Sequence, residues 1–181
     1  NGSGCTILRC FNYGHIQATV SDQSAYAGGI AGAFSAEDGT TTSEQNYNEG
    51  SVTAGAISSG SAAAGGIAGV LQGYYHIANS YNNGAIRADS AENDVSAGGI
   101  AGDLVQNISY GTIKNCYNTG TVASSDMKQQ GGIVGRYRYA WVQISDTIQS
   151  SYSINNDSLL GTASSTVIID DSCGNYANTT D

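Results

Sequence analysis

Aromatic and arginine side chains are the residues best suited to binding chemistry in this chain of 181 residues. They follow successive glycine-rich segments, and the set comprises Tyr74, Tyr75, Tyr110, Arg136, Tyr137, Arg138, Tyr139 and Trp141. If those segments project from one side, the rings and guanidinium groups form a surface that stacks on sugars or anchors a protein. The alternation of Tyr137, Tyr139 and Trp141 also fits a strand that packs its rings inward, and we favour this second interpretation.

Acidic pairs are the second group with chemical potential, because paired carboxylates hydrolyse glycosides or bind calcium. The pairs are Glu37–Asp38, Glu92 with Asp94, and Asp170–Asp171. No basic residue recurs beside them, as it does beside the carboxylates of solenoid lyases. We interpret them as solvated loop charge, and we predict no catalytic residue and no cofactor, with calcium possible but unsupported.

Zinc and disulfide chemistry find little support in the sequence. The only histidines, His15 and His76, lie in different segments, and no His-Glu-x-x-His motif is present. Cys5, Cys10, Cys116 and Cys173 form no CxxC pattern. Disulfides Cys5–Cys10 and Cys116–Cys173 are sterically conceivable, and buried free thiols are an equal alternative.

Composition limits the partners. The formal charge of -9 disfavours nucleic acid, and no run of 18 or more apolar residues predicts insertion into a membrane. The 25 glycines and the absence of proline predict many turns with positive φ in a β-rich chain. The chain begins Asn1-Gly2-Ser3, from which we infer a piece of a larger multidomain protein.

Two boxes recur along the chain and must position these side chains. The first is a double-glycine box at Ala27–Gly32, Ala64–Gly69, Ala97–Gly102 and Gln130–Gly135, with leading glycines 37, 33 and 33 residues apart. The second reads aromatic–Asn–x–Gly at Phe11–Gly14, Tyr47–Gly50, Tyr81–Gly84 and Tyr117–Gly120, with a decayed copy from Tyr152. Apolar residues at a spacing of two flank the second box and predict strands.

A single copy cannot bury its apolar stripe, so each copy is expected to stack on the next about 4.8 Å away. We therefore predict an all-β, parallel β-helix-like solenoid of four to five repeats of roughly 35 residues. Equivalent residues should form ladders: an interior isoleucine ladder from Ile30 to Ile133, an aromatic column beside it, and an amide ladder of Asn12, Asn48, Asn82 and Asn118 at a bend. Cys10 and Cys116 occupy one ladder position three copies apart, too far for a disulfide.

The length of the repeat is large for one tight coil, since about 35 extended residues trace roughly 110–120 Å. We therefore expect projecting loops at Phe34–Thr42, Val70–Tyr75 and Asp89–Asp94. A propeller with one blade per copy is the alternative fold. We assign the solenoid to residues 1–156, and a C-terminal cap or lead-in to a next domain to residues 157–181.

The glycine boxes resemble the GLUG repeat, whose core appears here as Gly29-Ile30-Ala31-Gly32 and its three counterparts. Asn115–Gly120 and Asn79–Gly84 also fit that family, and the resemblance spans residues 5 to 155. Isoleucine replaces the family's leucine. Members are bacterial surface or secreted proteins, including IgA-specific metallo-endopeptidases in which the repeats accompany a separate catalytic domain.

The resemblance implies an extracellular or cell-surface bacterial location and a non-catalytic role as a stalk and adhesion surface. Its partners would be a host or cell-surface protein or a glycan. Two functional alternatives stay open: a carbohydrate-binding module that uses the aromatic row, and an accessory domain of a surface peptidase. A hydrolase or lyase would require the acidic pairs to cluster.

Overall fold

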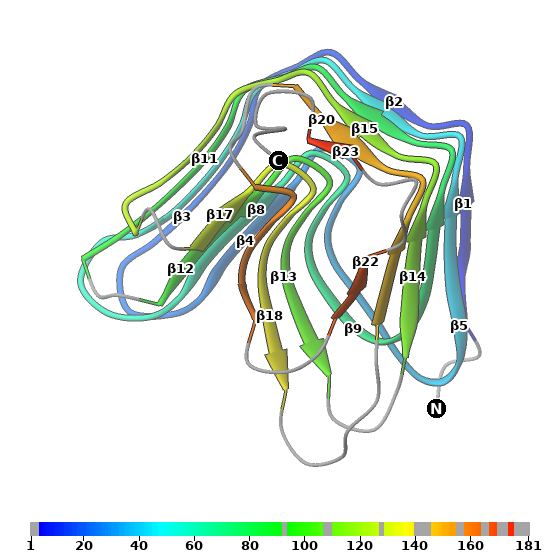
Figure 1. Cartoon of the computed structure of the whole chain (residues 1–181). Coiled ribbons are helices and arrows are strands. Elements are labelled where there is room, and N and C mark those ends of the chain that lie inside the picture. Colours follow the sequence, from blue (N-terminus) through cyan, green and yellow to red (C-terminus); the bar gives the residue numbers. More distant parts are fainter. Residues whose placement is uncertain are drawn as a thin grey trace.

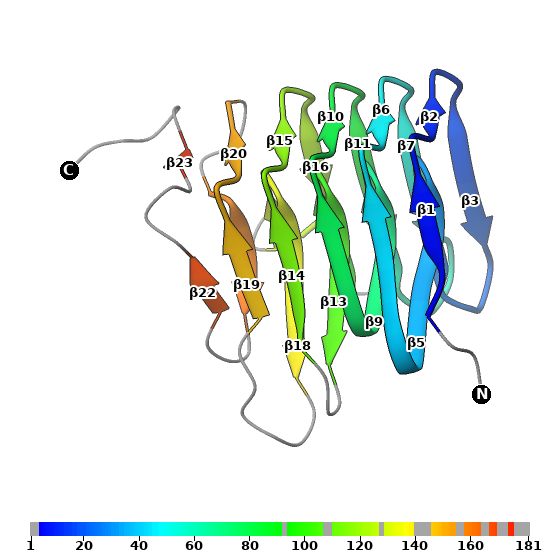
Figure 2. The same ribbon diagram turned by 90° about the vertical axis from the view of Figure 1, so that its right-hand side faces the viewer.

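The computed structural model describes residues 4–91, 94–106, 110–126, 129–139, 146–154, 158–163, 167–169 and 174–175. It confirms an all-β solenoid of about four turns, and the described residues contain no α-helix. Viewed along the solenoid axis, successive coils overlie one another, and from the side they lie next to each other like plates (Figures 1 and 2).

Four parallel sheets run along the solenoid, and each of the first four coils contributes to all of them. The first is the nine-stranded sheet of β1 (Thr6–Leu8), β5 (Ala31–Glu44), β9 (Ala68–Ala78), β13 (Ala101–Gln106), β14 (Gly111–Lys114), β18 (Val134–Tyr139), β19 (Asp146–Gln149), β21 (Leu160–Ala163) and β22 (Val167–Ile169). The second contains β2 (Phe11–Asn12), β6 (Tyr47–Asn48), β10 (Tyr81–Asn82), β15 (Tyr117–Asn118), β20 (Tyr152–Ser153) and β23 (Gly174–Asn175).

The other two sheets have four strands each. One contains β3 (Ile16–Val20), β7 (Val52–Ala56), β11 (Ile86–Ser90) and β16 (Val122–Ser124). The other contains β4 (Ala25–Gly28), β8 (Ala62–Gly65), β12 (Val95–Gly98) and β17 (Gln130–Gly131).

Each coil is folded back into two arms that meet at a bend (Figure 1). The first arm pairs the sheet of β3 with the sheet of β4, and small side chains fill it, among them Ala54, Ala64 and Ala88. The second arm contains the two halves of the nine-stranded sheet, and larger side chains fill it, among them Leu71, Ile77 and Tyr137.

This shape corrects the expectation of loops. Phe34–Thr42 lies within β5 and Val70–Tyr75 lies within β9, so both segments are strands of the coil. Asp89 belongs to β11. The long perimeter is accommodated because a coil flattened into two thin arms encloses little volume. The only register irregularity described between β5 and β9 falls between Ala36 and Thr41.

The interior ladders are confirmed. The backbone N–H of Ile30 donates to the Ile67 carbonyl at 3.1 Å, and the same bond joins Ile67 to Ile100 and Ile100 to Ile133 at 2.9 Å. The last three isoleucine side chains are fully buried. Equivalent isoleucines therefore meet along one axis, as the repeat predicts.

The asparagine ladder is also confirmed. The Nδ2 of Asn12, Asn48 and Asn82 donates to the Oδ1 of the asparagine in the next coil, in each case at 2.7 Å. The same Nδ2 also donates to the carbonyl of the glycine two residues later, at 2.8 Å for Asn82 and Gly84. Asn48, Asn82 and Asn118 are completely buried, and these bonds satisfy amides that water cannot reach.

The aromatic column forms, but on the outside of the bend. Neighbouring residues of a strand point to opposite faces, so the ring of each box faces solvent when its asparagine faces inward. The ring centroids lie 5.4, 5.1, 4.9 and 5.3 Å apart in the order Phe11, Tyr47, Tyr81, Tyr117, Tyr152. The interplanar angles between the tyrosines are 3° to 8°.

The glycine boxes serve close packing more than unusual φ angles. A Cβ on Gly66 would lie 2.5 Å from Cγ of Asn82, and one on Gly102 would lie 2.7 Å from the carbonyl oxygen of Ala64. Among the described residues, positive φ occurs only at Gly39, Gly60 and Gly73 among the glycines. The expectation that the glycines provide many turns with positive φ is therefore wrong for the described residues.

A left-handed residue starts the bend in every coil, and it is not glycine. Arg9, Gln45, Asn79, Asn115 and Ser150 have φ between 48° and 56°. Each stands two residues before the stacked aromatic. The backbone N–H groups of the first four donate to the next coil, as Asn79 does to the Lys114 carbonyl at 3.0 Å. Repetition of this costly conformation is sustained by coil-to-coil bonding.

The C-terminal segment contributes strands to the same stack. β21 pairs with β18, β22 with β19 and β23 with β20, all in parallel. The division of the chain at residue 156 stays a prediction.

Replacing Asn82 with alanine should lower the free energy of unfolding by about 3 kcal/mol, because the amides of neighbouring coils lose a buried partner. Urea unfolding followed by circular dichroism measures the change. Asn83→Ala is the matched control, since Asn83 is exposed, and it should cost less than about 0.5 kcal/mol. Equal losses in the two variants would show that the ladder is dispensable.

Candidate interaction surfaces

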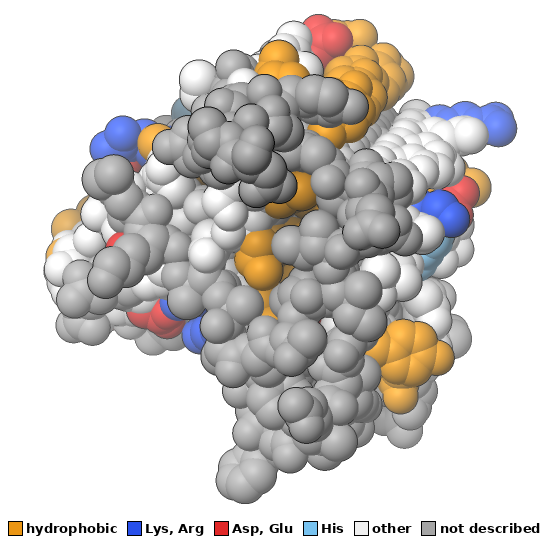
Figure 3. Space-filling model, in the orientation of Figure 1, with side chains coloured by type: hydrophobic (Ala, Val, Ile, Leu, Met, Phe, Trp, Pro, Cys, Tyr) orange, Lys and Arg blue, Asp and Glu red, His pale blue; other side chains and the backbone are white. Residues whose placement is uncertain are grey.

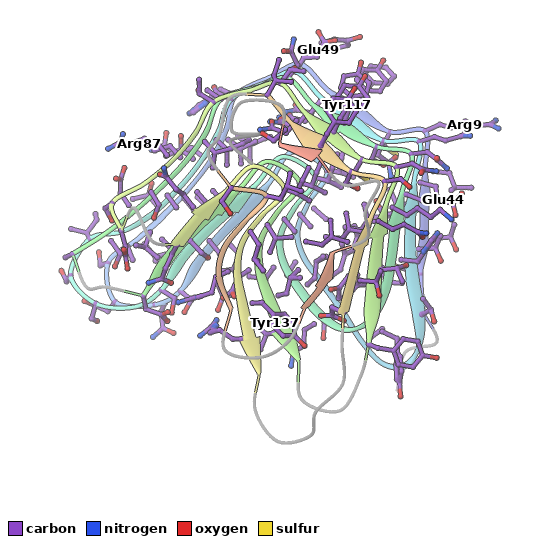
Figure 4. All side chains as sticks on the ribbon, viewed as in Figure 1. Arg9, Glu44, Glu49, Arg87, Tyr117 and Tyr137 are labelled. Atoms are coloured by element: carbon purple, nitrogen blue, oxygen red, sulfur yellow. The ribbon has the colours of Figure 1, made fainter. Side chains whose placement is uncertain are left out.

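The predicted aromatic row does not form a single surface among its six members whose side chains are described. Tyr75 and Tyr137 are 3% and 1% exposed, and both belong to the core of the second arm. Figure 4 shows Tyr137 within that arm. Tyr137 follows Phe34, Leu71 and Leu104 in register. Inward packing is therefore correct for Tyr137, while the Tyr139 side chain and Trp141 lie outside the described residues.

Tyr74 and Tyr110 are brought together on the second arm. Their ring centroids are 5.4 Å apart and the rings are perpendicular. Tyr110 is 60% exposed. An exposed edge-to-face pair offers one apolar ring face and two hydroxyl groups, which are the elements of a small sugar- or protein-contacting surface.

Arg136 and Arg138 bind acidic residues of the preceding coil. Arg136 and Asp103 are register neighbours on β18 and β13. The guanidinium of Arg136 donates through Nε and Nη2 to the two carboxylate oxygens of Asp103, at 3.2 and 2.7 Å. Arg138 Nη2 donates to the same carboxylate at 2.5 Å. We name Asp94, Asp103, Arg136 and Arg138 the charge cluster.

The charge cluster joins the two arms, because Asp94 directly precedes β12 of the first arm and binds Arg136 on β18 of the second arm. Figure 3 shows acidic and basic side chains close together beside the hollow between the arms. Asp103 is fully buried and Arg136 is 6% exposed, while Asp94 remains partly open to solvent. Arg136 Nη1 also donates to Asp94 and, at 2.7 Å, to Gln129. Ser61 donates to Asp94.

The pKa shifts follow from these contacts. Burial acts to raise the pKa of Asp94, but hydrogen bonds from Ser61 and Arg136 and the nearby positive charges outweigh it and lower the pKa. Burial acts to lower the pKa of Arg136, and its bonds to Asp103 and Asp94 raise it overall. The guanidinium groups thus have carboxylate partners, and a role in ligand binding would have to compete with them.

The remaining sequence candidates are dispersed over the structure and form no common site among the described residues. His15 Nδ1 lies 2.7 Å from Ser51 Oγ, and His76 Nδ1 lies 2.6 Å from Thr112 Oγ1. Cys5 and Cys10 are free and exposed, and Cys116 is a buried free thiol whose burial raises its pKa to about 12. Cys173, Glu92, Asp170 and Asp171 lie outside the described residues, as do the side chains of Glu37 and Asp38.

Within the described ranges, no group of three or more histidine, cysteine or acidic residues is arranged to hold a metal ion. The same part of the chain contains no helix long and apolar enough to cross a membrane.

The stacked tyrosines form a continuous strip on the surface. The sequence predicted this aromatic column, but beside the interior isoleucines. We call Tyr13, Tyr47, Tyr81, Tyr117 and Tyr152 the tyrosine strip. Tyr13 extends it at the first coil, where its hydroxyl lies 3.1 Å from that of Tyr47. This bond raises the pKa of Tyr13 to about 12. Figure 4 shows Tyr117 among the rings on the outside of the bend, with Glu49 near them.

The pKa values of Tyr81 and Tyr117, further along the strip, are also raised. Burial, followed by the charge of Glu49, raises the pKa of Tyr81, whose hydroxyl lies 3.5 Å from the Glu49 carboxylate. Burial likewise raises the pKa of Tyr117. The phenols of these residues are therefore protonated at neutral pH.

Comparison with known proteins establishes the fold class. No family model matches the chain, and neither does any curated protein. One solved structure is similar, from Bacteroides ovatus and described as a "putative immunoglobulin A1 protease", with a TM-score of 0.50 and 22% identity. The match covers 87% of this chain and 59% of that chain. The likeness supports the solenoid fold, and membership of the GLUG family stays a prediction.

The charge cluster makes a sharp prediction about stability. Asp103→Val should cost about 3 kcal/mol because it leaves a buried guanidinium short of a partner, whereas Asp103→Val with Arg136→Val should restore most of that loss. Valine suits both positions, since Val70 precedes Asp103 in the register. A double-mutant cycle from urea unfolding measures the coupling. Additive losses would mean that the pair is not coupled.

Proposed function

We propose that this chain is a non-catalytic repeat module of a bacterial cell-surface or secreted protein, serving as a spacer and interaction surface. Its partner would be a host or cell-surface protein or a glycan. The observation that supports this most strongly is the unbroken stack: the asparagine ladder and the tyrosine column pass from coil to coil without interruption. Stability then resides in contacts between neighbours, as in repeat scaffolds.

The dimensions indicate how such a module would work. Each coil adds about 4.8 Å along the axis, so four coils separate equivalent residues by only about 14 Å. The two arms present broad faces beside this short axis (Figure 1). As a stalk, the chain therefore contributes a short segment, while its sides offer most of the surface for contacts.

The likeness to the Bacteroides ovatus protein supports a setting next to a surface peptidase. In that setting the solenoid would hold or orient a separate catalytic domain and take no part in the chemistry itself. The GLUG-like boxes point to the same environment.

Deletion of one whole coil tests the spacer role. Removing Asn48 to Tyr81 joins Tyr47 to Asn82, two positions that are consecutive in the register of β6 and β10. We expect a folded protein with a cooperative thermal transition, because Asn12 can then donate to Asn82 as it now does to Asn48. Circular dichroism and small-angle X-ray scattering measure the fold and the shortening.

The matched control removes one residue fewer, Asn48 to Ser80. The extra residue shifts the strand by one position and turns ladder side chains to the wrong face, so this variant should lose its cooperative transition. Failure of both variants to fold would contradict a modular scaffold, as would equal stability of the two.

The Tyr74–Tyr110 pair favours a second candidate, a carbohydrate-binding module. Wild-type protein should then bind sugars on a glycan array, and Tyr74→Ala with Tyr110→Ala should weaken the affinity by about tenfold, because stacking area is lost. Tyr26→Ala is the control, since Tyr26 is 37% exposed on a separate strand. An array without bound sugars, or an unchanged affinity, would remove this candidate.

A further inference from the structure

We propose that the tyrosine strip is a site of oxidative cross-linking, at which one-electron oxidants join tyrosines of successive coils into dityrosine. The oxidant would be a haem peroxidase with hydrogen peroxide, or another system that generates phenoxyl radicals. The modification would tie one coil to the next by a carbon–carbon bond. It is independent of the ligand that the module binds.

The geometry of the strip carries this inference. Tyr47, Tyr81, Tyr117 and Tyr152 are held in register by parallel pairing of their strands. Their centroids are 4.9 to 5.3 Å apart and their planes differ by no more than 8°. Rings in parallel register place equivalent atoms at about the same separation, so the reactive ortho carbons of neighbours are about 5 Å apart.

Access is the second requirement. The tyrosine rings are half-buried, and the strip lies on the outside of the bend (Figures 3 and 4). Phe11, at the first coil, is 59% exposed, and Tyr13 is 60% exposed. An oxidant therefore reaches the strip from solvent without opening the solenoid.

The chemistry balances with the oxidant alone. Each of two phenols gives one electron and its hydroxyl proton, and the two phenoxyl radicals couple at ring carbons ortho to oxygen. Each coupled ring then moves its displaced ring hydrogen to its oxygen and recovers the phenol. The net change is loss of two hydrogen atoms from the protein, while one hydrogen peroxide is reduced to two waters.

Stacking also addresses the usual difficulty that two radicals must meet. A radical formed on one ring lies about 5 Å from the next, and exchange of an electron and a proton along the strip moves it until a second radical is adjacent. The Glu49 carboxylate, 3.5 Å from the Tyr81 hydroxyl, is a local acceptor for the phenolic proton. Holding both partners in place replaces a bimolecular encounter by an intramolecular one.

The test treats dilute wild-type protein with horseradish peroxidase and hydrogen peroxide, then measures dityrosine fluorescence and maps cross-linked peptides by mass spectrometry. We expect an intramolecular product that links peptides containing Tyr47 and Tyr81, Tyr81 and Tyr117, or Tyr117 and Tyr152. Its mass should be lower by two hydrogens per link. Cross-linked protein should also unfold at a higher temperature than the untreated protein, because the unfolded chain is constrained.

The decisive variant is Tyr47→Phe with Tyr117→Phe, which leaves no adjacent pair of tyrosines anywhere in the strip. Phenylalanine preserves the stacking, since Phe11 already stacks on Tyr47 at 5.4 Å. This variant should lose about tenfold or more of the dityrosine yield. The control, Tyr26→Phe with Tyr110→Phe, removes two other exposed tyrosines and should retain most of it.

The proposal is overturned if the decisive variant gives the wild-type yield, or if mapped links join tyrosines outside the strip. Only intermolecular products would overturn it as well. None of these outcomes bears on the spacer role, which depends on coil stacking and not on oxidation.

Discussion

Register between neighbouring coils is the constraint on which everything else in this protein depends. The asparagine amides are buried, and each satisfies its hydrogen bonds only when the next coil presents an asparagine or serine at the same height. A slip of one residue would turn the tyrosines inward and the amides outward. The amides would then lose their ladder and face solvent, and the tyrosine hydroxyl groups would be buried without partners. The glycine boxes reinforce this, because side chains there would collide with the backbone or the amides of neighbouring strands.

The two arms have separate cores that are filled by side chains of different size. Alanine dominates the first arm, which lets the two four-stranded sheets approach closely, while isoleucine, leucine and tyrosine fill the second arm. Fixed ladders therefore follow the bend and much of the two interiors. Residue types vary at outward positions and along the interior ladder that ends at Tyr137. The tyrosine strip belongs to this fixed part although it faces solvent, because Tyr47, Tyr81 and Tyr117 each directly precede a buried asparagine of the ladder, which fixes the position of the ring.

The hollow between the arms changes character along the stack. One ladder there runs from Ala33 through Val70 to Asp103 and Arg136, from small apolar residues to a buried ion pair. Such a pair costs desolvation energy that its hydrogen bonds must offset. The coils thus share one backbone path but differ in their outward-facing side chains. This is the property expected of a scaffold that carries distinct contact surfaces.

The sequence by itself determined the repeat, the parallel stacking and the ladders of isoleucine, asparagine and aromatic rings, because identical residues recurring at one period have a stable arrangement only when stacked. The tertiary structure alone decided the two-armed coil, the outward face of the rings, and the separation of Tyr74 and Tyr110 from the buried Tyr75 and Tyr137. It also decided the pairing of Asp103 with Arg136. These features depend on how the coil folds back on itself, and at such positions residue types differ between copies, so no periodic signal records them.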